Sequence, residues 1–220
     1  MIVVDIGTTG SDPQRHSIVS IGAVEYENHK NQFYGECRVF NGAEIDGEAL
    51  KINGFTRGEI TNELRQPHEK LLRKFTKWAY GINDHTLAGQ DAGKSDLLFI
   101  EHSLKRYSIP NRFGDMSVDL HTLSYEYLKR NGASFMETTD NKLNGHSSLS
   151  LNYTLMLTGL DEEPLPHHAL TGAKLKAEAF SRLMRGRSLF EDYSKYKLPD
   201  TLRDKTEKRM GPSLHVDVSC

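Results

Sequence analysis

Residues 3–12, VVDIGTTGSD, combine acidic, hydroxyl and glycine residues in a short stretch. Glycines and hydroxyls in a tight turn between two strands can surround phosphate oxygens with backbone N–H groups, and Thr8 and Thr9 stand at such a turn. Asp5 has two possible roles: it can cap the turn at the end of a strand, or it can bind a cation. The residue types alone leave both chemistries open.

Asp96 and His167 are the other residues whose side chains could take part in catalysis or metal binding. Each of them can also be explained by an ordinary structural role. Asp96, in SDLLFI, stands in the first turn of an expected helix, where the helix dipole favours an acid. His167, in PHHALTG, is by itself typical of a histidine in a surface loop. A function for either residue therefore depends on the elements around it.

Hydrophobic patterns predict an α/β domain that would position these residues. Three early strands followed by helices alternating with strands indicate a mixed sheet covered by helices. The segment 52–60, INGFTRGEI, is interpreted as a loop. The expected strands are 2–4, 17–26, 32–40, 85–89 and 116–123, and the expected helices are 64–78, 95–107, 124–132, 148–160 and 168–184. We predict one domain over residues 1–186 and a charged, mobile extension over 187–220.

Composition excludes some classes of protein. The net charge of −2 argues against a protein that coats nucleic acid by bulk charge, although it leaves room for a local basic groove. The two cysteines, Cys37 and Cys220, lie outside any metal-type spacing, which suits a reducing compartment. We find no signal peptide and no apolar run near 18 residues, so we expect a cytoplasmic protein without membrane contact.

Two families have a first loop of this kind. Actin-like and sugar-kinase ATPases place a phosphate loop after the first strand, but they also need a second phosphate loop and a glycine-rich adenosine loop. We find neither of these in the sequence. The motifs further along the chain favour the second family. IVSIGAV, NGFTRGEI, LAGQDAGKSDLLFI, VDLHTL and HHALTGAKLKAEAF occur in the order and at the intervals of the DEDDh 3′–5′ exonucleases, the class of RNase T and of the proofreading subunit of the bacterial replicative polymerase. Over roughly residues 1–186 the sequence resembles this family.

The resemblance implies a ribonuclease-H-like fold and cleavage of nucleotides from a 3′ end by two Mg²⁺ or Mn²⁺ ions about 4 Å apart. The family holds the ions with four carboxylates, since hard divalent ions prefer oxygen ligands. A histidine accepts the proton of the attacking water.

By this resemblance Asp5 and Asp96 are metal ligands, and both are catalytic together with His167, the general base. Gly7 and Gly172 stand where the family has its glutamate and its last aspartate. Two of the four carboxylates are therefore lost.

The loss changes the charge balance of the expected site. Four carboxylates balance two divalent ions, whereas Asp5 and Asp96 alone leave two positive charges without compensation. We therefore expect weak or no binding of Mg²⁺ or Mn²⁺ and little hydrolysis. Asp12 and Asp91 are the acids that could compensate. We expect neither glycine to be required for folding, since glycine costs about 0.5–1 kcal/mol relative to alanine in a strand or helix.

The residues expected to contact nucleic acid are Thr8, Thr9 and Phe55. The first two would hold the 3′-terminal nucleotide through the turn, and Phe55 would stack on a base or pack on its own core. Basic residues on the last helix are a further candidate surface, or simply a solvated face: Lys174, Lys176, Arg182, Arg185 and Arg187.

The sequence thus predicts an exonuclease-type α/β domain with a mixed five-stranded sheet and helices on both faces. Its expected partner is the single-stranded 3′ end of DNA or RNA, with a homodimer or a protein partner as further expectations. Two functions stay open: a module that binds 3′ ends with hydrolysis reduced or lost, and an active metal-dependent exonuclease with a compensated site.

Overall fold

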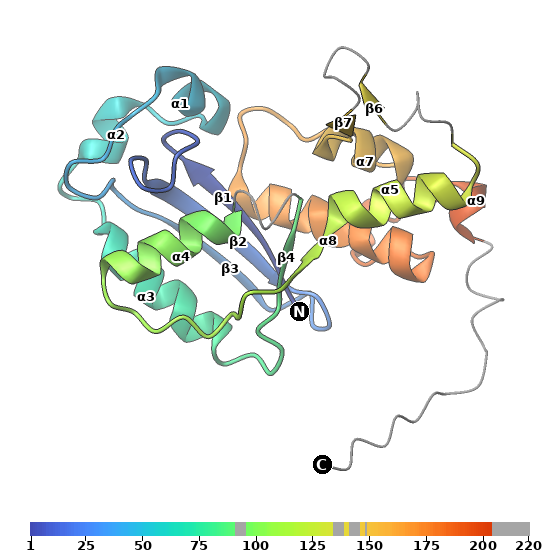
Figure 1. The fold of residues 1–220 in the computed structure, drawn as a ribbon, viewed down its shortest axis with the longest axis horizontal. Coiled ribbons are helices and arrows are strands. Elements are labelled where there is room, and N and C mark those ends of the chain that lie inside the picture. The colour runs from blue at the N-terminus through green and yellow to red at the C-terminus, as the bar shows by residue number, and fades with distance from the viewer. Residues whose placement is uncertain (91–95, 134–138, 141–145, 148, 204–220) are drawn as a thin grey trace.

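The computed structural model describes residues 1–90, 96–133, 139–140, 146–147 and 149–203. Five strands form one mixed sheet in the order β3-β2-β1-β4-β5, with the first three antiparallel and the last two parallel to β1 (Figure 1). This confirms the predicted fold class. The strands of this sheet are β1 (Ile2–Thr8), β2 (Ile18–Glu25), β3 (Gln32–Glu36), β4 (Leu87–Gly89) and β5 (Ser117–Asp119), and a small separate pair consists of β6 (Thr139–Asp140) and β7 (His146–Ser147).

Helices cover both faces of the sheet. The longer ones are α3 (His68–Ala79), α4 (Asp96–Arg106), α5 (Leu120–Arg130) and α8 (Ala169–Arg185), and the shorter ones are α1 (Gly47–Asn53), α2 (Arg57–Thr61), α7 (Leu151–Leu157), α9 (Asp200–Arg203) and the 3₁₀ turn η2 (Glu191–Tyr193). None of the described helices is both long and apolar enough to cross a bilayer.

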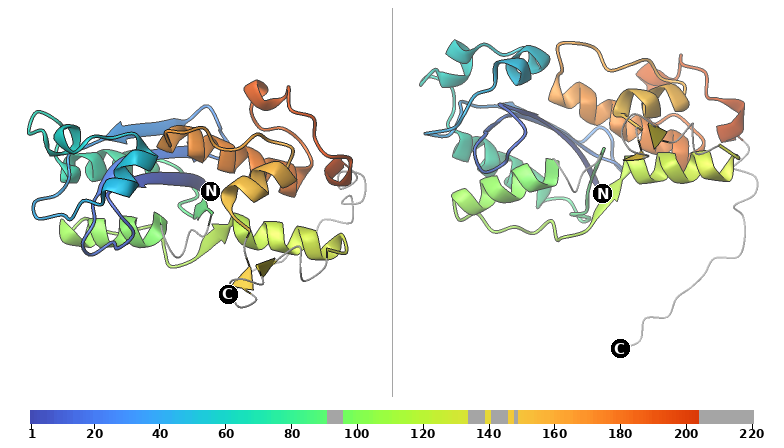
Figure 2. Two further views of the ribbon diagram at one scale, coloured as in Figure 1. Left: turned by 90° about the horizontal axis from the view of Figure 1, so that it is seen from above. Right: turned by 45° about the horizontal axis from the view of Figure 1, so that its top comes forward.

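The central strand β1 is buried on both sides, which its run of β-branched residues favours. Val3 belongs to the core beneath α5, α7 and α8, whereas Ile2 and Val4 belong to the core beneath α3 and α4. Figure 2 shows the two helical layers from two further directions. Because side chains alternate along a strand, Asp5 lies on the same face as Val3, toward α8.

Close packing brings α8 to this face. Gly22 on β2 is the register partner of Asp5, and a β-carbon there would overlap the backbone of Ala169 at the start of α8. The helix can therefore approach the sheet beside Asp5 because position 22 has no side chain.

The segment interpreted as a loop covers the end of α1 and most of α2, which corrects the prediction for residues 52–60. Asp46 caps α1 through the N–H of Glu48. Thr56 and Glu59 form a reciprocal capping box at the start of α2. The T-x-x-E pattern of that box was readable in the sequence.

Residues 187–203 pack against the body of the domain, so the boundary predicted at residue 186 falls inside the packed region. The buried Arg182 donates to the carbonyls of Tyr193 and Tyr196, and the buried Glu178 accepts from the N–H groups of Leu189 and Phe190. Residues 204–220 lie outside the described part of the chain.

This packing also corrects the predicted basic surface of the last helix. Lys176 and Arg182 are buried, and Arg185 pairs with Glu27 while lying over the ring of Tyr26. These three residues therefore form no continuous cationic track for nucleic acid.

Candidate functional site

Asp5 and Asp96 come together at the end of the sheet, as their predicted role requires. Asp5 lies on the central strand and Asp96 is the first residue of α4, and both are buried. A third residue joins them, because the ammonium group of Lys176 on α8 lies between the two carboxylates. Lys176 Nζ donates to Asp5 Oδ1 at 2.8 Å and to Asp96 Oδ2 at 3.0 Å.

The ammonium group is fully partnered in this position. Its third acceptor is the carbonyl oxygen of Val4, at 3.4 Å, and the side chain of Lys176 is only 5% exposed. Burial lowers the pKa of Lys176, but the attraction of Asp5 and Asp96 outweighs burial and raises the pKa above its ordinary value. Lys176 is therefore a permanent cation at neutral pH.

The electrostatics of Asp5 are a balance of opposing effects. Burial raises its pKa from 3.8 to about 6, and Lys176 opposes this rise. The neighbouring carboxylates of Asp96 and Glu163 add to the rise, whereas His167 lowers it. Asp5 Oδ1 accepts from Lys176 and from the N–H of Ile6, but Oδ2 is buried without a hydrogen-bond partner.

His167 faces that oxygen. Its Nε2 lies 3.7 Å from Asp5 Oδ2 and has no hydrogen-bond partner, while its Nδ1 lies 2.9 Å from Glu163 Oε1. Burial lowers the pKa of His167, but the hydrogen bond with Glu163 and the charge of Asp5 raise it further, so that the net shift is upward. The structure thus brings together all three predicted catalytic residues and adds Lys176 and Glu163.

The two glycine positions are occupied by neighbours rather than open. A β-carbon on Gly7 would overlap the hydroxyl of Ser20 and lie 3.2 Å from Asn53 Oδ1. A β-carbon on Gly172 would overlap Asp5 Oδ2 and lie 2.6 Å from Glu163 Oε1. The present arrangement of Asp5 and Glu163 therefore depends on the missing side chain at position 172. The atoms that would be overlapped are the ends of side chains, so the expectation that neither glycine is required for folding stays a prediction.

The pair of divalent ions implied by the family does not fit these residues. An ion bridging Asp5 and Asp96 would compete with the ammonium of Lys176, which already contacts both carboxylates. The positions of Gly7 and Gly172 supply no ligand atoms. We therefore derive no step through two metal ions for this chain.

Of the residues expected to contact nucleic acid, Thr9 has a structural role. It has no exposed surface, its hydroxyl donates to the carbonyl of Glu44 and accepts from the N–H of Ser17, and its own N–H donates to the carbonyl of Ser17. Thr8 is partly exposed and its hydroxyl donates to the carbonyl of Gly10. Thr8 is thus better placed than Thr9 to contact a ligand.

Phe55 is half-buried. It packs against the small core of Val19, Leu50 and Ile60, and the guanidinium of Arg65 lies 5.3 Å from its ring centre. The structural alternative for Phe55 therefore accounts for its present contacts.

Of the two acids named as compensating ligands, Asp12 makes its hydrogen bonds away from the site. Asp12 accepts from the N–H of Gln14, and its own N–H donates to His16. Asp91 lies outside the described residues. Glu163 is the acid that approaches. It lies in a non-helical segment, where a spacing of four residues does not place two side chains together, so the sequence carried no signal for it.

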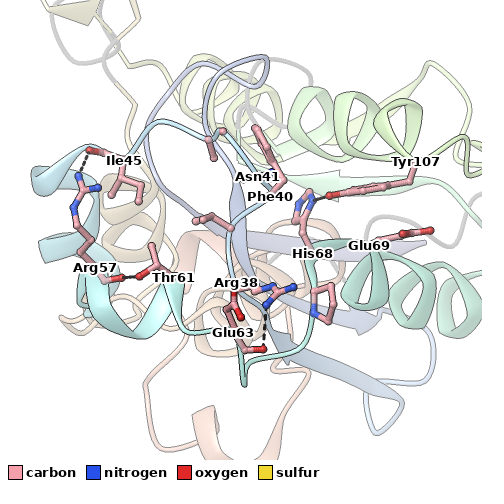
Figure 3. A pocket seen from close by; sticks show the side chains of 14 residues that line it. Arg38, Phe40, Asn41, Ile45, Arg57, Thr61, Glu63, His68, Glu69 and Tyr107 are labelled. Atoms are coloured by element: carbon pink, nitrogen blue, oxygen red, sulfur yellow. Dashed lines mark hydrogen bonds between the residues drawn. The ribbon is translucent and has the colours of Figure 1, made fainter.

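A pocket of about 610 Å³ lies apart from this site, between the loop after β3, α2 and α3 (Figure 3). Its charged lining is balanced, with Arg38 and Arg57 opposed by Glu63 and Glu69. His68 in its wall is neutral, since burial lowers its pKa to about 4. The pocket contains none of the predicted site residues and carries no preference for an anion.

No family model and no curated protein sequence match this chain. Solved structures do match. The nuclease domain of 3′hExo, described as a DEDDh family member bound to rAMP, has a TM-score of 0.61 at 14% identity over 90% of this chain and 95% of that one. Cell-death related nuclease 4 (CRN-4) has a TM-score of 0.63 at 13% identity, and the match covers 85% of this chain and 64% of that one. E. coli Exonuclease I in complex with a dA16 oligonucleotide has a TM-score of 0.62 at 15% identity, and the match covers 93% of this chain and 42% of that one.

These identities are low, so the likeness is one of fold. The chain spans less than half of the Exonuclease I structure but nearly all of the 3′hExo nuclease domain. The chain therefore has the mixed five-stranded, ribonuclease-H-like fold that these exonucleases share.

Proposed function

We propose that this chain is an exonuclease-family protein that binds the single-stranded 3′ end of DNA or RNA and has lost hydrolysis by the two-metal route. One observation carries the loss of hydrolysis. Lys176 Nζ contacts the carboxylates of Asp5 and Asp96, the two metal-ligand positions that the sequence retains. A fixed ammonium neutralises these acids, but it cannot bind and activate a water molecule as a divalent ion does.

Three features support binding to a 3′ end. Proteins of the same fold have been solved with rAMP and with dA16 and dT13 oligonucleotides. Thr8 directly follows Gly7 and is partly exposed as the last residue of β1, the strand that carries Asp5. Lys176 also removes one negative charge from the place that the terminal phosphate would approach, which lowers the repulsion between protein and phosphate.

The test uses the full chain and a single strand labelled at its 5′ end. We expect a rise in fluorescence anisotropy on binding, equal in EDTA and in Mg²⁺, that weakens between about 50 and 200 mM salt. Electrophoresis of the same samples should show a strand of unchanged length. A strand blocked by a 3′-phosphate is the matched control, and it should bind more weakly. Absence of binding, or equal binding of the blocked strand, would contradict the proposal.

A second candidate function is an active 3′–5′ exonuclease with a compensated site. It is favoured by Glu163, whose carboxylate lies beside the position vacated at Gly172 and contacts His167. A metal-dependent ladder of shortened strands in the same assay would select this candidate over the first.

The proposal retains the expectations drawn from the sequence for location and assembly, namely a cytoplasmic protein that forms a homodimer or binds a protein partner. Size-exclusion chromatography with light scattering checks the homodimer.

A further inference from the structure

We infer that Asp5, Glu163 and His167 form a site for one divalent transition-metal ion, with Lys176 beside it as a built-in second cation. This goes beyond the proposed function, since binding of one ion does not by itself restore hydrolysis. The ligand set also differs from the four carboxylates of the resembled family, because it uses the imidazole of His167 and a glutamate outside the family's motif positions.

Two buried atoms without partners point to the ion. Asp5 Oδ2 and His167 Nε2 face each other at 3.7 Å, and neither makes a hydrogen bond. The side chain of Asp5 is 7% exposed, so water does not readily satisfy this oxygen. A buried polar atom without a partner costs about 1–3 kcal/mol, and a cation between the two atoms would remove both penalties.

The distances suit a metal ion. Bonds from such an ion to oxygen and nitrogen are about 2.0–2.2 Å, so two ligand atoms on one ion can stand up to about 4.3 Å apart. The 3.7 Å between Asp5 Oδ2 and His167 Nε2 lies within this limit. One ligand atom from each of Asp5, Glu163 and His167 lies within 4.8 Å of the other two, so a small approach of Glu163 completes three-point coordination.

Glu163 also fixes the imidazole. Its Oε1 lies 2.9 Å from His167 Nδ1, so that a proton on Nδ1 leaves the lone pair of Nε2 directed at Asp5 Oδ2. This hydrogen bond orients the ring before an ion binds. Glu163 must then turn away from Nδ1 to become a ligand, because Nδ1 and Nε2 point to opposite sides of the ring. Gly172 makes room for this arrangement, because a β-carbon there would overlap Asp5 Oδ2 and crowd Glu163 Oε1.

Charge favours one ion and excludes two. Asp5, Asp96 and Glu163 carry three negative charges, and Lys176 returns one positive charge, so the ionised cluster has a net charge of −2. A single divalent ion neutralises it, whereas a second would leave a charge of +2 in a buried place. The mixed nitrogen and oxygen ligands favour Mn²⁺ or Zn²⁺ over Mg²⁺, which prefers oxygen.

The test titrates Mn²⁺ into the full chain and counts the free ion by electron paramagnetic resonance. We expect one bound Mn²⁺ per chain, with Mg²⁺ competing at least about tenfold more weakly. Pulsed measurements on the bound ion should show nitrogen coupling from His167. Both readouts use the unmodified protein, so they stand even where a variant folds poorly.

Matched variants assign the ligands. Glu163→Gln and His167→Asn should each weaken binding about tenfold or more, and the second should abolish the nitrogen coupling. Glu162→Gln and His168→Asn change exposed neighbours of the same types and should leave the affinity within about twofold. Two bound ions per chain, no binding below about 1 mM Mn²⁺, or equal effects in the control variants would overturn the inference. Nucleic-acid binding in EDTA tests the proposed function separately.

Discussion

Lys176→Met is the most informative single change, because methionine keeps most of the length of the side chain and removes only its charge. The ammonium of Lys176 holds two buried carboxylates together, at 2.8 Å from Asp5 Oδ1 and 3.0 Å from Asp96 Oδ2. Without it, two acids face each other in a buried place with no cation between them. The folded state must then take up a proton or pull the carboxylates apart.

The size of the effect follows from the burial. Removing one partner of a buried, hydrogen-bonded ion pair destabilises a protein by about 3–5 kcal/mol, because a charge is left without compensation. Lys176 is 5% exposed and its two partners 7% and 8%, so solvent screens the loss little. We therefore expect a loss of about 3–5 kcal/mol in the free energy of unfolding at pH 7.

The loss should grow with pH. In the folded wild type the pKa of Asp5 is raised by burial from 3.8 to about 6 while Lys176 opposes the rise, so removing Lys176 raises it further. A carboxyl group with a raised pKa contributes stability below its unfolded pKa and loses it as the pH rises through the folded pKa. In the wild type the free energy of unfolding stops falling a little above pH 6, once Asp5 is ionised. In the variant it continues to fall, because the pKa of Asp5 is higher. Between pH 6.5 and 8 the variant should lose up to about 1.4 kcal/mol per pH unit relative to wild type.

The assay is urea unfolding at pH 6, 7 and 8, followed by the fluorescence of the single tryptophan, Trp78, on α3. Lys174→Met is the matched control, since Lys174 lies on the same helix with its ammonium 5.9 Å from the ring centre of Phe190 and outside the ion pair. The control should cost less than about 1 kcal/mol at each pH. A difference between Lys176→Met and wild type that stays constant from pH 6 to 8, or that Lys174→Met reproduces, would refute the reasoning.

Three further predictions concern the glycine positions and Cys37. The triple variant Gly7→Glu, Gly172→Asp, Lys176→Ala should gain Mn²⁺-dependent shortening of a labelled strand. The double variant that keeps Lys176 should not, because the ammonium group still contacts the two ligand carboxylates. Shortening by the double variant would show that Lys176 does not exclude the ions. Gly172→Ala should lower the free energy of unfolding by about 1–3 kcal/mol through overlap with a carboxylate, while Gly58→Ala, whose β-carbon meets nothing within 4 Å, should leave it unchanged or raise it, as urea unfolding will show. Burial raises the pKa of the Cys37 thiol and shields it from reagents. In a Cys220→Ser variant, Cys37 should therefore react with a thiol reagent at pH 8 only on unfolding. Fast reaction of the folded protein would contradict this.

Much of the fold could be predicted from the sequence because it depends on periodicity. The apolar run at the start of β1 and the stripe along α8 are properties of consecutive residues, and both elements form close to where they were expected. The helices α1 and α2 were missed because they are short and only their caps identify them. The docking of residues 187–203 was missed because it depends on the buried side chains of Glu178 and Arg182, which look like surface charges in the sequence.

The sequence predicted that Asp5, Asp96 and His167 lie together, as they do, but not that a lysine lies among them; their catalytic and metal-binding roles stay predictions. Lys176 was interpreted as part of a basic surface, yet it lies four residues after Gly172, a spacing that places both residues on one face of a helix. Once position 172 is assigned to the site, position 176 must be considered with it. A count of carboxylates alone therefore misses the cation that stands among them.

The glycine at 172 and the lysine at 176 depend on each other through Asp5. A side chain at 172 would overlap Asp5 Oδ2, and the carboxylate could move aside only by changing the geometry that lets Oδ1 accept from Lys176 at 2.8 Å. Residues that share a partner in this way should show non-additive energies. Once Lys176→Met has broken the ion pair, Gly172→Ala has less left to disturb, so the double variant should lose less stability than the sum of the two single losses, by about 1 kcal/mol or more. Strict additivity in that cycle would mean that the two positions act independently and that the ammonium does not need the space left at 172.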